Sequence, residues 1–120
     1  MTHEEVQDWL DRYIRAWRSG DREQIEALFS QDAVYRYNPH DESRWVRGRE
    51  AIANAWLNER DESESWEARY TAYAVDGDRA VATGASRYFA TADEPEKTYH
   101  TAFVLKFDDD LRCTEFVEYG

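Results

Sequence analysis

Apolar residues recur three and four positions apart along the first part of the chain, which is the spacing of an amphipathic helix. These apolar positions are Val6, Trp9, Leu10, Tyr13, Ile14 and Trp17. Thr2 and Glu5 are spaced as a capping box before them, and Gly20 favours a helix end after them. Asp21 can then cap a second helix. The pattern predicts two helices that meet at a tight corner.

The stretch from Gln31 to Leu57 changes its period twice. Residues 32–39 alternate in the manner of a strand, with Tyr35 and Tyr37 on one face, and Pro39 is expected to end it. Residues 40–47 are charged and turn-like. After Gly48, apolar residues recur four positions apart, which predicts a third helix.

The remaining chain has the short period of strands separated by turn residues. The predicted strands are roughly Trp66–Val75, Arg79–Thr91, Thr98–Phe107 and Arg112–Tyr119. Asp76-Gly77 marks the first turn, residues 92–97 the second and residues 108–111 the third. Three successive hairpins predict an antiparallel meander.

This order of elements predicts an α+β fold in which a curled antiparallel sheet packs on three N-terminal helices and forms a cone. A chain of 120 residues is most simply one domain, covering residues 1–120. The open end of such a cone is expected to hold an apolar cavity, the kind of place where small ligands bind.

Composition narrows the possible partners. The net charge of -11 would repel nucleic acid phosphates and anionic lipid. No apolar run approaches the ~20 residues of a membrane span, and the first residues have no signal-peptide pattern, so a cytoplasmic location is expected. Cys113 is the only cysteine, which excludes an intramolecular disulfide and a thiolate metal cluster.

Several segments together resemble the nuclear transport factor 2-like superfamily, in particular its SnoaL-like and limonene epoxide hydrolase-like branches. They are LFSQDAVYRY, the helix start GREAI and the closing strand. The resemblance implies a cone fold and a homodimer formed through the sheet. Because the superfamily includes hydrolases, isomerases, dehydratases, cyclases and pure binding proteins, it fixes the fold more closely than the activity.

Carried over residue by residue, the epoxide hydrolase resemblance puts Tyr35 where that family holds the attacking water. Tyr37 stands in place of its asparagine, and Glu118 keeps a carboxylate in place of its inward aspartate. Ala85 and Arg87 stand where the family has an arginine and a second aspartate, so its carboxylate-arginine-carboxylate relay is lost.

Strand alternation counted from presumed core positions such as Ala85 places Arg87 and Glu118 on the concave face. We expect them to be the catalytic pair, with Glu118 transferring a proton and Arg87 orienting an oxygen. A structural ion pair at the cone mouth, or two side chains that reach water, is the alternative. The residues expected to contact a ligand are Tyr13, Trp17, Tyr35, Tyr37, Trp56, Phe103 and Phe116. Tyr88 is a further wall candidate, although its neighbour Arg87 points to the opposite face.

Other cofactor and metal signals are missing from the sequence. No metal-binding spacing of His and Cys, no G-x-G-x-x-G and no phosphate-binding loop occurs, so neither a metal nor a nucleotide cofactor is expected. His40, beside Asp41, is either a proton carrier or a solvated loop residue. The parity of His100 predicts the convex face.

The sequence therefore predicts a protein that binds a small hydrophobic or amphipathic organic molecule in an aromatic-lined pocket. An enzyme with this site would be a cofactor-independent isomerase, lyase or hydrolase using acid-base chemistry. The alternatives are a non-catalytic carrier or sensor, and a dimeric interaction module whose convex sheet carries His100, Val104 and Val117.

Overall fold

The computed structural model describes residues 1–120 and contains helices packed on one six-stranded sheet. The helices are α1 (His3–Ser19), α2 (Arg22–Ala27), the 3-10 helix η1 (Glu42–Arg44) and α3 (Arg49–Asn58). The strands are β1 (Phe29–Arg36), β2 (Trp45–Arg47), β3 (Trp66–Asp76), β4 (Arg79–Tyr88), β5 (Lys97–Phe107) and β6 (Cys113–Tyr119).

The two helix starts predicted from the sequence are confirmed. The Glu5 N–H donates to Thr2 Oγ1 at 3.1 Å, and the Thr2 N–H donates to Glu5 Oε1 at 2.9 Å, which completes a capping box. Gly20 ends α1 with a φ of 65°, a left-handed conformation that glycine adopts without strain. The Asp21 side chain then accepts backbone N–H groups at the start of α2.

The strand order in the sheet is β2-β1-β6-β5-β4-β3, and β3 to β6 form the predicted antiparallel meander. The pairing of β1 with β6 is parallel and was not predicted. β1 also lies earlier in the chain than predicted, at Phe29–Arg36 instead of residues 32–39. It ends before Pro39 because Asn38 begins a turn: the Asn38 side chain accepts the His40 N–H, and the Asn38 carbonyl accepts the N–H of Asp41.

Residues 40–47, predicted to be a turn-like segment, also contain η1 and the short strand β2, which pairs with β1. Trp45 fixes the segment by donating its Nε1–H to the Asn38 carbonyl oxygen at 2.9 Å. Three residues are too few for periodicity to reveal a strand, so the sequence pattern could not separate β2 from the turn.

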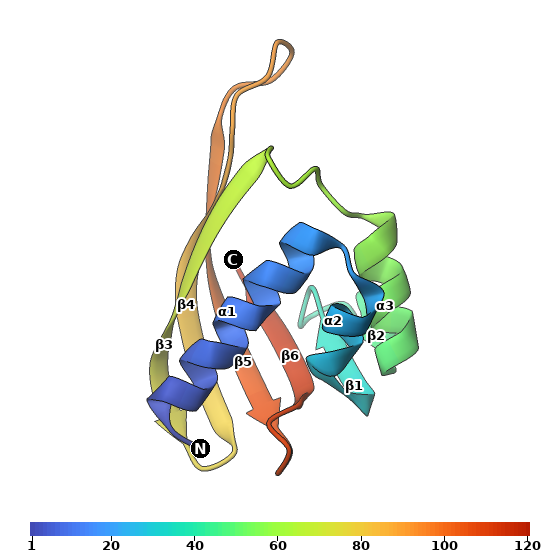
Figure 1. Ribbon diagram of the computed structural model, residues 1–120, viewed down its shortest axis with the longest axis vertical. Helices are drawn as coiled ribbons and strands as arrows, with labels where there is room; N and C mark the ends of the chain where they lie inside the picture. The colour runs from blue at the N-terminus through green and yellow to red at the C-terminus, as the bar shows by residue number, and fades with distance from the viewer.

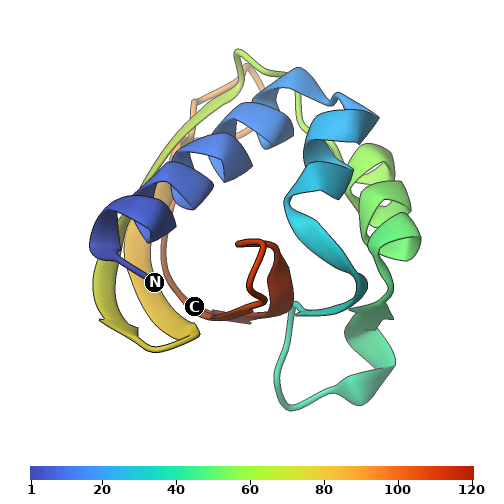
Figure 2. The ribbon, with the colours of Figure 1, turned by 60° about the horizontal axis from the view of Figure 1, so that its bottom comes forward.

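The sheet curls around the helices, and Figure 2 shows helices and strands arranged as a ring. Two register shifts help the strands to bend, between Ala72 and Ala74 in β3 and between Lys106 and Phe107 in β5. Figure 1 shows α1 lying across the concave face of the sheet, with the β4–β5 hairpin extending beyond the rest of the molecule. The predicted α+β cone is confirmed.

The core is solid under the first half of α1. Trp9 is fully buried, its rings pack edge-on against Phe29 and Phe107, and its Nε1–H donates to the Leu28 carbonyl at 3.0 Å. The open space of the cone is therefore confined to the part lined by the second half of α1. None of the helices is both long enough and apolar enough to cross a bilayer.

Candidate functional site

An inner cavity of about 180 Å³ lies between the second half of α1 and the concave face of the sheet. Most of its wall is aromatic. The lining residues are Tyr13, Ile14, Trp17, Tyr35, Tyr37, Trp66, Ala68, Tyr70, Ser86, Tyr88 and Glu118. Their side chains come from α1, the end of β1, and strands β3, β4 and β6, so the cavity exists only once the whole cone has formed.

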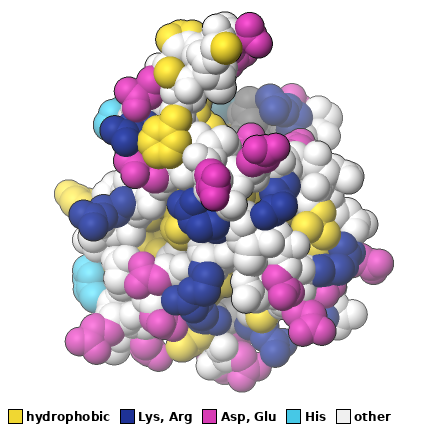
Figure 3. All heavy atoms as spheres, turned by 45° about the horizontal axis from the view of Figure 1, so that its top comes forward, with side chains coloured by type: hydrophobic (Ala, Val, Ile, Leu, Met, Phe, Trp, Pro, Cys, Tyr) yellow, Lys and Arg dark blue, Asp and Glu magenta, His cyan; other side chains and the backbone are white.

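A wider hollow of about 720 Å³ adjoins the inner cavity and forms its mouth. The residues that line both are Tyr37, Tyr70, Ser86, Tyr88 and Glu118. Three charged residues line the mouth but not the inner cavity. They are Asp61, from the loop before β3, and Glu94 and Lys97, from the β4–β5 hairpin. Figure 3 looks onto this end of the molecule, where acidic and basic side chains alternate below the projecting hairpin.

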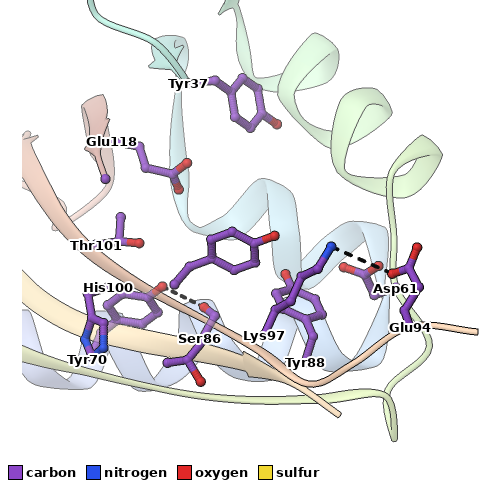
Figure 4. A pocket seen from close by; sticks show the side chains of 13 residues that line it. Tyr37, Asp61, Tyr70, Ser86, Tyr88, Glu94, Lys97, His100, Thr101 and Glu118 are labelled. Carbon is purple, nitrogen blue, oxygen red and sulfur yellow. Dashed lines mark hydrogen bonds and ion pairs between the residues drawn. The ribbon is translucent and has the colours of Figure 1, made fainter. Parts of the chain in front are cut away.

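Glu118 stands where the cavity meets the mouth. Phe116 is fully buried in β6, and strand alternation turns Glu118, two residues later, to the same concave face. Burial alone raises the pKa of its carboxyl, with no charged partner to oppose the effect. Figure 4 shows the carboxyl directed into the open space between Tyr37, Thr101 and Tyr88.

Phenols surround this carboxyl. Burial raises the pKa of Tyr13, Tyr35 and Tyr37, and the negative charge of Glu118 raises each of them further. Burial, followed by the neighbouring Asp61 carboxylate, raises the pKa of Tyr88 to about 12. The phenols therefore remain neutral at physiological pH, and each keeps a hydroxyl hydrogen that it can donate.

A hydrogen bond of 2.8 Å joins the hydroxyls of Tyr70 and Ser86 across β3 and β4 (Figure 4). The Tyr70 ring stacks on Phe103 with a centroid separation of 4.4 Å, which fixes its orientation. Tyr70 therefore presents a positioned hydroxyl at the boundary between cavity and mouth.

The structure corrects the predicted position of Arg87. Its guanidinium forms ion pairs with Glu67 at 3.0 Å and with Glu96 at 3.2 Å, and its side chain is half exposed on the convex side. The cause is a parity error along β4, since Ala80 and Ala82 are the buried positions and Ala85 shares the outward face of Arg87. The expected pairing of Arg87 with Glu118 does not form.

The predicted ligand contacts divide into two groups. Tyr13, Trp17, Tyr35 and Tyr37 line the inner cavity, and their binding role stays a prediction. Trp56, Phe103 and Phe116, in contrast, are buried in the core behind the cavity wall and border neither hollow. The prediction that these three residues contact a ligand is therefore wrong. Aromatic rings such as Tyr13 pack between them and the open space.

Sequence reasoning missed the contribution of β3 to the site. Trp66, Ala68 and Tyr70 all line the inner cavity. Their alternate spacing and apolar character were a usable signal, because residues two apart in a strand share one face. The parity of Tyr88 places it on the inward face, opposite to Arg87.

Of the histidines discussed above, neither lies beside Glu118. His40 is exposed, and its backbone N–H donates to the Asn38 side chain. His100 is exposed and lines a shallow hollow on the convex side as well as the rim of the mouth. Figure 4 places His100 at the edge of the site beside Tyr70.

Residues 10–116 match a family model described as the SnoaL-like domain, which is most of the chain. The chain belongs to the SnoaL-like domain family. The resemblance to the nuclear transport factor 2-like superfamily seen in the sequence is thereby confirmed. No curated protein matches this SnoaL-like chain by sequence.

Several solved structures share the fold of this chain. A structure described as an M. tuberculosis LEH-like epoxide hydrolase is 15% identical, with a TM-score of 0.70, and the match covers 98% of this chain and 83% of that one. A putative polyketide cyclase from Sinorhizobium meliloti is 19% identical, with a TM-score of 0.71 and coverage of 99% and 100%. An NTF-2 like protein of unknown function from Burkholderia xenovorans LB400 is 15% identical, with a TM-score of 0.70 and coverage of 97% and 82%. At these identities the likeness concerns the fold.

Proposed function

We propose that this SnoaL-like protein binds a small amphipathic organic molecule in the inner cavity, with Glu118 as its polar partner. The observation that carries this proposal is a partly buried carboxyl without a protein partner at the junction of an aromatic cavity and a wide mouth. A concave apolar site with a few convergent polar groups and one perturbed titratable group is the usual form of a ligand pocket.

The dimensions of the two hollows limit the size of the ligand. A cavity of roughly 150 Å³ is enough to hold benzene, so the inner cavity of about 180 Å³ takes about one six-membered ring or a compact branched group. The mouth of about 720 Å³ has room for a polar remainder. The ligand that fits is therefore small at its apolar end and less restricted at the other.

We propose that any reaction in this site uses Glu118 for proton transfer. A carboxyl whose pKa is raised by burial exchanges protons nearer to neutral pH than a solvated one. Neutral phenols such as Tyr35 and Tyr37 supply hydrogen bonds to a substrate oxygen. Such an enzyme is a cofactor-independent isomerase, lyase or hydrolase, and it works without Arg87.

Two similar structures are described as an epoxide hydrolase and a putative polyketide cyclase, so epoxides and polyketide-like ketones are the first substrates to test. Product formation that is abolished in Glu118→Gln supports the enzyme. A ligand that is recovered unchanged after prolonged incubation supports the carrier, which is favoured by the lack of any cationic side chain beside Glu118.

Filling the inner cavity tests the binding site itself. We expect Ala68→Leu to weaken the binding of phenol and cyclohexanone by about tenfold or more, because the added methyl groups occupy space that the ring needs. Isothermal titration calorimetry measures this effect. Ala74→Leu, on an exposed position of the same strand, is the matched control and leaves binding unchanged. Equal binding by both variants and the wild type would place the ligand elsewhere.

The convex face of the sheet is our candidate surface for homodimerisation. Val104 and Tyr119 are 40% and 46% exposed and lie on neighbouring strands, with His100 exposed nearby. Val117 is only 4% exposed, so its expected contribution to this surface is small. Exposed apolar side chains gathered on a sheet are typical of a protein interface.

A further inference from the structure

We propose that the occupant of this pocket is an organic cation: a protonated amine or a quaternary ammonium group carried on a small apolar body. This inference deepens the function proposed above and rests on it, because it assumes that the inner cavity is a ligand site and adds the charge of the ligand. It is carried by the lining of the cavity, the isolation of Glu118 and the charges around the mouth.

The lining of the inner cavity contains one carboxyl and no base. Glu118 is its only Asp or Glu, and no Lys, Arg or His borders it. A buried carboxylate is unfavourable unless a positive charge or several hydrogen bonds compensate it. Within the protein, Glu118 has neither an ion pair nor a hydrogen bond of its own, and burial is the only influence on its pKa. A cationic ligand would supply the missing charge.

The rest of the wall suits a cation as well. Trp17, Trp66 and five tyrosines border the cavity, and the faces of such rings attract positive charge, which is how aromatic cages recognise ammonium ligands. Trp66 already binds one cation in this way, since the Arg18 guanidinium carbon lies 4.3 Å from the centre of its ring. An anion would instead meet the Glu118 carboxylate.

The mouth adds further negative charge. Burial raises the pKa of Tyr37 and Tyr88 most, and the carboxylates of Glu59 and Asp61 respectively raise them further, so both acids act on phenols that line the entrance. Lys97 also lines this entrance, but its Nζ lies 4.0 Å from a Glu94 carboxylate oxygen, so its charge is partly offset. With a net charge of -11, the whole molecule attracts cations toward the opening.

Three probes of nearly equal shape test the charge preference directly: benzylamine, benzyl alcohol and benzoate. At neutral pH they carry a positive, zero and negative charge. We expect benzylamine to bind at least about tenfold more tightly than benzyl alcohol, because only the amine gains the charge and ring interactions, and benzoate to bind weakest. Quenching of tryptophan fluorescence reports on binding, since Trp17 and Trp66 border the cavity.

Two variants test whether Glu118 causes the preference for a cationic probe. Glu118→Gln should lower the affinity for benzylamine to about that for benzyl alcohol, while Glu115→Gln, on the opposite face of the same strand and paired with Arg36 at 3.0 Å, leaves it unchanged. Benzyl alcohol or benzoate binding as tightly as benzylamine to the wild type overturns the inference but leaves the ligand site standing. Absence of binding by all three probes overturns both.

Discussion

Glu118 is a carboxyl that the fold partly removes from water without giving it a partner. Its neighbours are phenols, whose pKa values the Glu118 charge raises in Tyr13, Tyr35, Tyr37, Tyr70 and Tyr88. None of these phenols ionises near neutral pH, so Glu118, the only carboxyl among them, is the group in this cluster that loses its proton first as the pH rises. Its protonation state therefore controls the polarity of the whole cavity.

The raised pKa of Glu118 has a direct consequence for stability. A carboxyl that holds its proton more tightly in the folded protein than in the unfolded chain favours folding below its ordinary pKa, and this contribution is lost as the pH rises through the folded value. Glu118→Gln removes the ionisation. The difference in the free energy of unfolding between the variant and the wild type should therefore shift in favour of the variant as the pH rises from about 4 to about 7.

Urea unfolding of both proteins at the two pH values measures the difference in the free energy of unfolding. The predicted result is a larger advantage for Glu118→Gln at the higher pH. A constant or falling difference would mean that the Glu118 carboxyl is solvated in the folded protein, which would remove the basis of the proposed site.

At the scale of elements, the curvature of β3 and β4 positions the wall of the cavity. Gly84 in β4 lies against the β3 backbone, where a Cβ atom would clash with the Arg69 carbonyl oxygen and would lie 2.8 Å from the Tyr70 Cα. The register shift between Ala72 and Ala74 lies further along the same pair of strands. The close approach at Gly84 brings Tyr70 to the hydroxyl of Ser86.

Gly84→Ala is therefore expected to destabilise the protein by about 2–4 kcal/mol, because the clash is with backbone atoms that cannot turn aside. Thermal unfolding followed by circular dichroism measures the loss. Ala85→Ser, one position along on the convex face, is the control, with an expected change within about 0.5 kcal/mol. A Gly84→Ala variant as stable as the wild type would show that β3 and β4 do not approach this closely.

The sequence was most informative where a local pattern has one physical meaning. The capping box at Thr2 and Glu5 and the period of α1 predicted that helix almost to the residue. Parity along β4 failed because Ala80, Val81 and Ala82 are all small and apolar, so either face of the strand could have been the buried one. A shift of one residue then moved Arg87 from the predicted pocket to the convex side.

The candidate site was partly predictable for a related reason. A sequence pattern identifies an aromatic side chain as inward-facing, which holds for both Tyr35 and Phe116. Whether that ring then borders a hollow or packs behind another ring depends on contacts between elements that are distant in the chain. Phe116 stacks on Tyr35 with their centroids 4.3 Å apart, so the tyrosine covers it.

At the scale of the whole molecule, the two faces of the sheet have different proposed roles, with a ligand on the concave side and a second copy of the chain on the convex side. Because the two copies in a twofold dimer present the same patch to each other, a charge introduced at its centre meets its own copy or lies close to it. The acidic chain, at net charge -11, adds to this repulsion.

Val104→Glu should therefore shift the protein from dimer to monomer at micromolar concentration, measured by light scattering coupled to size-exclusion chromatography. Asn58→Glu, on the exposed end of α3, adds the same side chain away from the sheet and should leave the dimer intact. A wild-type protein that elutes as a monomer would contradict the proposed interface and leave the ligand site unaffected.

The account as a whole depends on Glu118 lying in a secluded pocket that a ligand can enter. Carbon-13 NMR of its side-chain carboxyl, titrated with acid in the absence and presence of benzylamine, measures this most directly. We predict a pKa above the ordinary 4.5 in the free protein, because burial disfavours the charged form, and a lower pKa with benzylamine bound, because the ammonium favours it. An ordinary pKa that benzylamine does not change would contradict the account.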